Sequence, residues 1–257
     1  MKADYVLLDP TGNMTILVKT PFPPSERPRI AAELMAREPA AEQVGFLSHE
    51  EGFDLALGMA GGEFCGNASM CAGVLAAAER GIVRGDMTLR VSGAAGPVKV
   101  RVLRCEDGSW QGRVSMPEPF SIREAELPGI GRRPLVFFDG IAHIIMEGRP
   151  DRAAAEALAP KLARFLQADA AGMMFLDPEN ETLTPLVSVP GAGTLCWENS
   201  CASGTAAVGA YLASKNGGSA DLSLRQPGGS LAVSVRNGRT ILLSGSVRIL
   251  RKETVSL

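Results

Sequence analysis

Blocks of alternating hydrophobic and polar residues fill most of the 257-residue chain, and glycine, proline or Asp-Gly turns separate them. Alternation of this kind predicts short strands with one buried face. Two longer apolar runs, at residues 74–78 and 206–213, each follow a turn of small residues and predict buried helices. The pattern therefore predicts an α+β protein in which each half has one central helix among strands.

The predicted elements follow a similar order in both halves of the chain. Strands are expected at residues 5–8, 14–18, 44–47, 87–92, 98–103 and 111–116, and again at 135–138, 143–146, 172–176, 183–189, 195–197, 221–224, 230–235 and 240–244. Helices are expected at 29–37, from 66 to about 80, at 151–167 and at 202–212. The proline- and glycine-rich stretch 127–134 is the predicted boundary. The N-terminal lobe is then 1–126, completed by a C-terminal strand at 245–257, and the C-terminal lobe is 127–244.

Net charge and composition argue against several classes of partner. A formal charge of −2 with scattered basic residues argues against a nucleic-acid or anionic-membrane ligand. No apolar run approaches the roughly 20 residues of a membrane span, and the first residues lack the basic and apolar regions of a signal peptide. We therefore expect a cytoplasmic protein, with a homodimer as the default assembly.

The five cysteines set the candidate chemistry. Their number is odd and their spacing fits neither a disulfide framework nor a zinc site, so we expect no bound metal. Cys71, Cys105 and Cys196 are interpreted as small buried residues. Cys65 and Cys201 differ, because each stands in a turn directly before a predicted helix. At that place the helix dipole and unpaired backbone N–H groups favour a thiolate.

Two such thiols in opposite halves suggest an internal duplication and one particular reaction class. If both thiols converge on one cleft, a thiolate can abstract a proton from a carbon while a thiol delivers a proton to its opposite face. The backbone N–H groups of the next residues would bind a substrate carboxylate and stabilise the charge that develops beside it. These residues are Gly66, Asn67, Ala202 and Ser203. We expect no cofactor, because the thiol pair makes pyridoxal phosphate unnecessary and no lysine stands in a comparable position.

Several motifs resemble those of the diaminopimelate epimerase superfamily, which comprises cofactor-independent amino-acid racemases and epimerases. They are Gly12-Asn13, Glu42-Gln43, Cys65-Gly66-Asn67, Met116-Pro117-Glu118-Pro119, Cys201-Ala202-Ser203-Gly204 and Pro227-Gly228-Gly229. The resemblance covers nearly the full length, and the two cysteine motifs are specific in combination. It implies two pseudo-symmetric lobes, each a curled antiparallel sheet around a central helix, with Cys65 and Cys201 as catalytic residues. It also implies that Asn13 and Gln43 bind the substrate, which is a small molecule, an amino acid.

Other positions depart from the diaminopimelate epimerase pattern. Met70 replaces an arginine, Gly58 or Met59 replaces an asparagine, and Gly140-Ile141-Ala142-His143 replaces a Gly-Asn-Pro-His segment. A pocket with these apolar side chains would leave the second zwitterion of diaminopimelate unpaired, at about 1–3 kcal/mol for each buried polar group. The departures therefore disfavour diaminopimelate as the substrate.

The segments Gly-Gly-Glu-Phe-Cys-Gly-Asn and Trp-Glu-Asn-Ser-Cys instead resemble the histidine racemases of this superfamily, which supply D-histidine for opine-type metallophores. The resemblance implies interconversion of L- and D-histidine. Candidate contacts to the amino group or the side chain are Glu63, Glu198, His143 and Trp197. Structural alternatives exist: Glu63 could complement the helix dipole, His143 could be a core histidine, and Trp197 could pack between lobes.

Two rival functions stay open at this point. One is an isomerase of the phenazine-biosynthesis type, in which Glu63 would be the proton shuttle. The other is a non-catalytic protein that binds an amino acid. The presence of both Cys65 and Cys201 argues against each rival. For a racemase, diaminopimelate or another amino acid is the alternative substrate.

Overall fold

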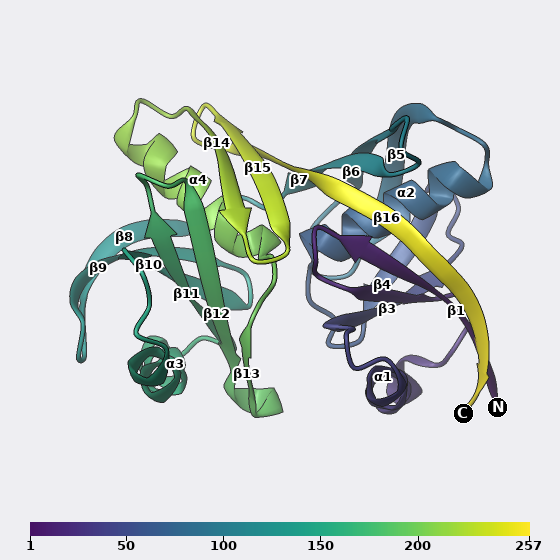
Figure 1. Cartoon of the computed structure of the whole chain (residues 1–257), viewed down its shortest axis with the longest axis horizontal. Coiled ribbons are helices and arrows are strands. Elements are labelled where there is room, and N and C mark those ends of the chain that lie inside the picture. The colour runs from purple at the N-terminus through teal and green to yellow at the C-terminus, as the bar shows by residue number, and fades with distance from the viewer. The chain divides into compact units, whose positions relative to one another are not determined.

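The computed structural model describes all 257 residues and contains four α-helices and sixteen strands (Figure 1). Contacts divide the chain into two units. Unit 1 is Met1–Ser115 together with Ser244–Leu257, and unit 2 is Met116–Leu243. The prediction of an α+β protein with two similar halves is confirmed.

Unit 1 is a ring of strands around one helix. Its elements are β1 (Lys2–Pro10), β2 (Thr15–Val18), a short 3-10 helix (Pro24–Glu26), α1 (Arg27–Arg37), β3 (Gln43–Ser48), β4 (Leu55–Met59), α2 (Gly66–Glu79), β5 (Arg84–Val91), β6 (Val98–Arg104), β7 (Trp110–Met116) and most of β16 (Thr240–Ser256). The strands pair in the order β1-β2-β3-β4-β5-β6-β7-β16, and β16 pairs back with β1. α2 packs against β1, β2, β4, β5 and β6, and its residues are buried from Gly66 to Ala77. A helix that is apolar on all sides is the kind that a sheet can enclose.

Unit 2 has the same plan around α4. Its elements are β8 (Ser121–Leu127), β9 (Gly131–Phe138), β10 (Ile141–Glu147), α3 (Arg152–Leu166), β11 (Ala170–Asp177), β12 (Thr182–Val189), a short 3-10 helix (Pro190–Ala192), β13 (Thr194–Trp197), α4 (Ala202–Lys215), β14 (Ala220–Gln226), β15 (Gly229–Arg236) and the first residues of β16. The strands pair in the order β16-β15-β14-β12-β11-β10-β9-β8, and β13 pairs with β12. α4 packs against both β14–β15 and β9–β11.

The directions of the strand pairs repeat between the units. In unit 1, β2 is parallel to β3 and β4 is parallel to β5. In unit 2, β10 is parallel to β11 and β12 is parallel to β14. The antiparallel pairs also correspond: β1–β2 matches β9–β10, and β3–β4 matches β11–β12. The predicted curled sheets are therefore mixed, because a helix connects the two strands of each parallel pair.

A second helix in each unit covers the opposite face of part of the sheet. In unit 1 the alternate residues Tyr5, Ile16 and Phe46 form one hydrophobic cluster with Ile30 and Leu34 of α1. In unit 2, α3 packs in the same way against β9–β12 through Ala155, Ala159 and Leu162. None of the four helices combines the length and the apolar content that crossing a membrane would need.

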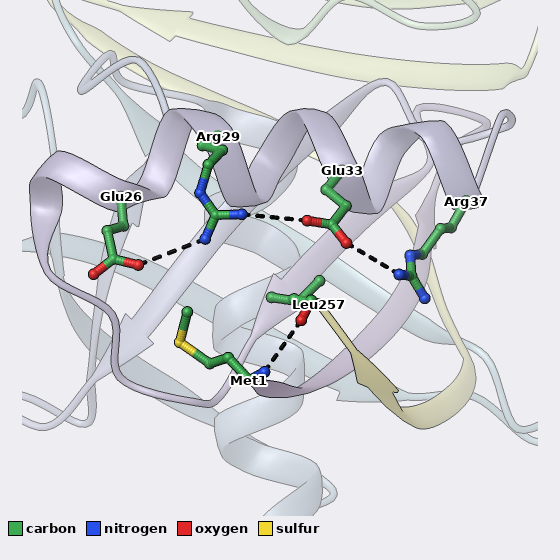
Figure 2. Close-up of polar contacts among 6 residues, drawn as sticks. All are labelled: Met1, Glu26, Arg29, Glu33, Arg37 and Leu257. Carbon is green, nitrogen blue, oxygen red and sulfur yellow. Dashed lines mark hydrogen bonds and ion pairs between the residues drawn. The ribbon is translucent and has the colours of Figure 1, made fainter.

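The outward face of α1 is polar. It carries a series of ion pairs, shown in Figure 2, that joins in order Glu26, Arg29, Glu33 and Arg37. Exposed pairs of this kind stabilise a helix by only about 0.2–0.5 kcal/mol each. Below the helix, the N-terminal amino group of Met1 donates to the backbone oxygen of Leu257 over 3.1 Å (Figure 2). Both chain ends thus belong to unit 1, as the outer ends of β1 and β16.

The boundary between the units differs from the predicted one. It lies between Ser115 and Met116, whereas the sequence pattern placed it at 126/127. The pattern missed β8, which pairs with β9 from Ser121↔Phe137 to Leu127↔Gly131. Most side chains of β8 are charged or only half-buried, so its sequence shows no apolar face. The glycine-rich stretch 127–134 is the turn and the start of β9 in this hairpin.

Candidate functional site

Cys65 is the N-cap of α2. Its backbone is extended (φ −131°, ψ 115°), and its Sγ accepts a hydrogen bond from the backbone N–H of Ala68 over 3.4 Å. The hydroxyl of Ser69 donates to the backbone oxygen of Cys65 over 2.7 Å. A side chain that caps a helix in this way satisfies one of the N–H groups that the first turn leaves unpaired. The sulfur is thereby held at the positive end of the helix dipole.

Cys201 has the same position at the start of α4. Its backbone is extended (φ −116°, ψ 107°), and its Sγ accepts from the backbone N–H of Gly204 over 3.3 Å. The hydroxyl of Thr205 donates to the backbone oxygen of Cys201 over 2.7 Å. The two predicted cysteines thus make matching contacts to the residues three and four positions later, which is what a duplication of one thiol site produces.

The surroundings of Cys201 oppose ionisation of its thiol. The side chain is only 4% exposed. Burial, followed by the charge of Glu198 and a hydrogen bond to it, raises the pKa of Cys201 well above its ordinary value. The Ser203 hydroxyl and the Gly204 N–H act in the opposite direction but are smaller effects. We expected the helix terminus to lower this pKa, but the cost of burying a charge outweighs it.

A glutamine side chain supports the turn before α4. The Oε1 of Gln226 accepts from the backbone N–H of Cys201, and its Nε2 donates to the hydroxyl of Thr205, each over 2.8 Å. Gln226 is on β14 and is 4% exposed. It therefore fixes the backbone of Cys201 from the sheet, and nothing in the local sequence around Gln226 predicted this role.

The surroundings of Cys65 are more polar. Its half-buried thiol donates to Oε1 of Gln43 over 2.8 Å. The Nε2 of Gln43 donates to the side-chain oxygens of Asn13 and Thr15, and Asn13 donates in turn to Glu42. Asn13 and Gln43, both predicted to bind substrate, therefore lie in one network with the cysteine. Thr15 and Glu42 were not predicted, although Glu42 adjoins Gln43 in the motif that we singled out.

The four predicted backbone donors lie in the first turns of the two helices. Gly66 and Asn67 follow Cys65 in α2, and Ala202 and Ser203 follow Cys201 in α4. The first backbone N–H groups of a helix point out of its N-terminus and favour an anion there. The hydroxyl of Ser203 also lies 3.6 Å from the sulfur of Cys201. Each thiol is thus adjacent to backbone groups that can bind a carboxylate.

Three of the predicted contact residues have contrasting environments. Glu63 is exposed in the turn before α2. Glu198 is half-buried and lies beside the thiol of Cys201. His143 on β10 is fully buried, packs edge-on against Phe138, and makes no hydrogen bond through either ring nitrogen. The structure thus gives His143 the environment of a core residue.

Trp197 packs within unit 2. Its indole N–H donates to Glu156 of α3 over 2.7 Å, and the guanidinium of Arg152 lies 4.5 Å from the centre of its ring. Its ring also lies 5.9 Å from that of Phe175. Trp197 therefore anchors β13 to α3 and β11.

Two further residues were not predicted: Met174 lies beside Cys201 at Gly204, and Arg27 lies beside Gly58. The sulfur of Met174 lies 2.1 Å from the place where a Cβ on Gly204 would stand. The guanidinium of Arg27 lies 2.6 Å from the place of a Cβ on Gly58, which is one of the two positions, Gly58 or Met59, where the diaminopimelate epimerase pattern has an asparagine. Neither residue stands in a recognisable motif, so only the packing of distant segments reveals them. No group of three or more His, Cys, Asp or Glu side chains is arranged to hold a metal ion.

The arrangement can support proton transfer at a carbon next to a carboxylate. Each helix N-terminus offers backbone donors for the carboxylate and one sulfur that can exchange a proton. All five cysteines are outside disulfides, so both sulfurs are available as thiols.

Comparison with known proteins identifies the family. Residues 2–255 match the family described as "Histidine racemase CntK N-terminal domain". A histidine racemase of Fusobacterium nucleatum subsp. nucleatum is 32% identical over 260 residues, which cover 96% of this chain and 94% of the relative. A histidine racemase of Staphylococcus aureus (strain Mu50) is 30% identical over 245 residues, which cover 90% of this chain and 88% of the relative.

A solved structure shares the fold. The phenazine biosynthesis protein of the PhzF family from Bacillus anthracis superposes with a TM-score of 0.75 at 15% identity, over the full length of both chains. At this identity the likeness concerns the fold alone. It therefore gives no support to a phenazine-type isomerase, and the histidine racemase relatives favour an isomerase over a non-catalytic binding protein. Together with the family match over nearly all of its residues, these relatives show that the chain belongs to the histidine racemase family of isomerases.

Proposed function

We propose that this chain interconverts L- and D-histidine by proton transfer through Cys65 and Cys201, without a cofactor. The observation that supports the two-cysteine mechanism best is the equivalence of the two thiols. Each is the N-cap of the central helix in its unit and makes the same contacts to the following turn. The proposal requires that both thiols reach one substrate carbon.

In the proposed reaction, one cysteine as thiolate takes the proton from Cα. The other cysteine, as thiol, gives its proton to the opposite face of that carbon, so the configuration is inverted and the net protonation of the pair is unchanged. The backbone N–H groups of Gly66, Asn67, Ala202 and Ser203 are the proposed donors to the substrate carboxylate, where negative charge develops as the Cα–H bond breaks.

Glu198 is the proposed contact to a positively charged group of the substrate, such as its α-ammonium. Its carboxylate lies beside Cys201 and raises the pKa of that thiol. A bound ammonium group would offset the negative charge of Glu198 and so make ionisation of Cys201 easier. Binding of substrate would then activate a thiol that is otherwise kept protonated by burial.

Glu63 and His143 are also proposed as substrate contacts. Glu63 is exposed, so a ligand can approach it, whereas His143 would need its neighbours to move before it could be reached. The proposed location is the cytoplasm, where the thiols would stay reduced. A homodimer is proposed as the assembly, to be checked by the mass in solution.

The test is proton exchange in heavy water. L-Histidine incubated with the protein in D2O should lose its α-proton signal in NMR spectra while D-histidine accumulates. The variants Cys65→Ser and Cys201→Ser should each lower the rate by at least 100-fold, and Cys105→Ser is the matched control. Near-normal racemisation by either of the first two variants would contradict the two-cysteine mechanism.

A panel of other amino acids defines the substrate. Diaminopimelate, glutamate and proline should exchange at least 100-fold more slowly than histidine under the same conditions. Faster exchange with any of them would reassign the substrate but leave the mechanism in place.

A further inference from the structure

A chain of hydrogen bonds in unit 1 ends at the thiol of Cys65. The thiol donates to Oε1 of Gln43 over 2.8 Å. Nε2 of Gln43 donates to Oδ1 of Asn13, and Nδ2 of Asn13 donates to a carboxylate oxygen of Glu42. The chain therefore runs from a sulfur through two amides to a carboxylate, and all four residues belong to one unit.

The carboxylate of Glu42 fixes the direction of this chain. An ionised carboxylate only accepts hydrogen bonds, so Asn13 must turn its NH2 group toward Glu42 and its carbonyl toward Gln43. Because Asn13 presents its carbonyl oxygen, which only accepts hydrogen bonds, Gln43 must turn its NH2 group toward Asn13. The group that Gln43 presents to Cys65 is then its carbonyl oxygen.

Thr15 fixes the orientation of Gln43 a second time. The hydroxyl of Thr15 donates its one proton to the backbone oxygen of Asn13 over 2.9 Å. Toward Gln43 it can therefore only accept, which it does from Nε2 over 3.0 Å. Reversal of the Gln43 amide would break its bonds to both Asn13 and Thr15.

A carbonyl oxygen opposite a sulfur favours the thiol over the thiolate. The S–H group has an acceptor there, whereas a thiolate would face the negative end of the carbonyl dipole. Two further titratable groups lie near this network: Asp9, near the end of β1, and Cys71 on α2, whose pKa is raised chiefly by burial. Both are acids, so their ionisation would act on Cys65 in the same direction as the charge of Glu42.

The equivalent positions of unit 2 cannot form this chain. Thr15 pairs with Gln43 at the start of β2 and β3, and at the start of β10 and β11 the corresponding pair is Ile141 with Ala170. These side chains have no hydrogen-bonding groups. Asp169, which precedes Ala170 as Glu42 precedes Gln43, is exposed. The two cysteines therefore match in their helix caps but differ in what faces the thiol.

We propose that Glu42, acting through Asn13 and Gln43, holds Cys65 as the thiol before substrate binds. Cys65 is then the acid in the direction in which Cys201, activated when the substrate ammonium offsets the charge of Glu198, is the base. This inference rests on the proposed function. The Cα–H bond breaks and its proton passes to the thiolate of Cys201, while the S–H bond of Cys65 breaks and its proton forms the new Cα–H bond. Cys65 ends as the thiolate and Cys201 as the thiol. Glu42 is a positioning residue that acts on Cys65 through the two amides.

The test measures the protonation of Cys65 directly. The full-length protein is alkylated with iodoacetamide in short pulses at a series of pH values, and mass spectrometry follows the peptide that contains Cys65. Glu42→Gln should lower the midpoint of alkylation by about one pH unit. The matched control is Asp169→Asn, which removes a carboxylate from the equivalent position of unit 2 and should leave the midpoint unchanged. An unchanged midpoint in Glu42→Gln would overturn the inference.

A second variant separates the hydrogen-bond chain from the simple effect of charge. Gln43→Met keeps the carboxylate of Glu42 but removes the carbonyl that faces Cys65. It should lower the midpoint by a similar amount, and the double variant should add little, because both changes interrupt one chain. If Glu42→Gln shifts the midpoint and Gln43→Met does not, the charge acts through space and the chain has no role. Asn13→Ser tests the same link should Gln43→Met fail to fold.

The alkylation midpoint of Cys65 is measured independently of the racemisation assays. If Cys65→Ser and Cys201→Ser keep their activity, the proposed function fails whatever the alkylation midpoints show. If both variants are inactive and the midpoint does not respond to Glu42, the reaction stands and only the role of Glu42 is rejected.

Discussion

Gly73 and Gly209 make the same close contact in the two units. A Cβ on Gly73 of α2 would stand 2.6 Å from Cγ1 of Val100 on β6, and a Cβ on Gly209 of α4 would stand 2.8 Å from Cγ1 of Val233 on β15. Each glycine comes eight positions after the cysteine that caps its helix. The duplication therefore extends from the thiols to the packing of each central helix on its sheet.

This contact predicts that one methyl group added at either glycine lowers the free energy of unfolding. Gly73→Ala and Gly209→Ala should each destabilise the protein by about 1–3 kcal/mol, because the buried helix cannot move away from the valine without disturbing its other contacts. Urea unfolding followed by circular dichroism gives the free energy of unfolding. Gly96→Ala, which meets nothing within 4 Å, is the control and should change it by less than about 0.5 kcal/mol. If neither Gly73→Ala nor Gly209→Ala lowers the free energy of unfolding by more than Gly96→Ala does, the helices have room to shift.

His143 makes the stability of the fold depend on pH. Burial lowers its pKa from 6.5 to about 3. Between these values the unfolded chain binds one more proton than the folded chain, so the free energy of unfolding falls as the pH drops, by up to about 1.4 kcal/mol per pH unit. The stabilisation is complete above about pH 6.5 and is lost progressively toward pH 3.

Replacement of His143 by leucine tests this prediction and also its role. Leucine is the residue of the other unit at the same register, since Leu17 pairs with Gly45 as His143 pairs with Gly172. His143→Leu should flatten the fall in stability between pH 6 and pH 4, measured by urea unfolding. His49→Gln, at an exposed site, should leave it unchanged. A folded His143→Leu protein that no longer racemises histidine would show that the imidazole has a functional role.

Gly204 leaves the space in which Cys201 and Met174 meet. A Cβ at this position would stand 2.1 Å from the sulfur of Met174 and 3.1 Å from that of Cys201. We expect Gly204→Ala to lower the racemisation rate at least tenfold, because one of the two sulfurs must move. The double variant Met174→Ala/Gly204→Ala should recover part of the loss. No recovery, with the protein still folded, would mean that the alanine acts directly on Cys201.

Glu198 is expected to affect both the ionisation of Cys201 and the binding of histidine. Its charge and its hydrogen bond raise the pKa of Cys201, so Glu198→Gln should lower the pH at which the thiol ionises. NMR of protein labelled with 13C at cysteine Cβ would follow this titration. The same variant should raise KM for histidine roughly 10- to 100-fold, as loss of a hydrogen bond to a charged group predicts. Glu156→Gln, which changes the carboxylate that accepts from the indole N–H of Trp197, is the control for KM. An unchanged KM would remove Glu198 from the substrate contacts.

The sequence by itself determined the class of the fold and the two thiols. Strand alternation, the two enclosed helices and the turns before them depend on neighbouring residues, and these local patterns predicted most elements of both units. Cys65 and Cys201 were recognisable because an N-cap is defined within one helical turn. The strand β8 was missed for the same reason, since a strand with exposed charges on both faces has no apolar period.

Only the tertiary structure decided what surrounds each thiol. The parallel register of β2 and β3 brings Asn13 and Glu42 together with Gln43, and Gln43 contacts Cys65. Gln226 reaches Cys201 from a strand that comes after the helix. The balance of burial against the helix dipole at Cys201 likewise depends on atoms from distant segments. Charge effects and hydrogen bonds act through space, so a linear pattern can locate a reactive group but cannot give its protonation state.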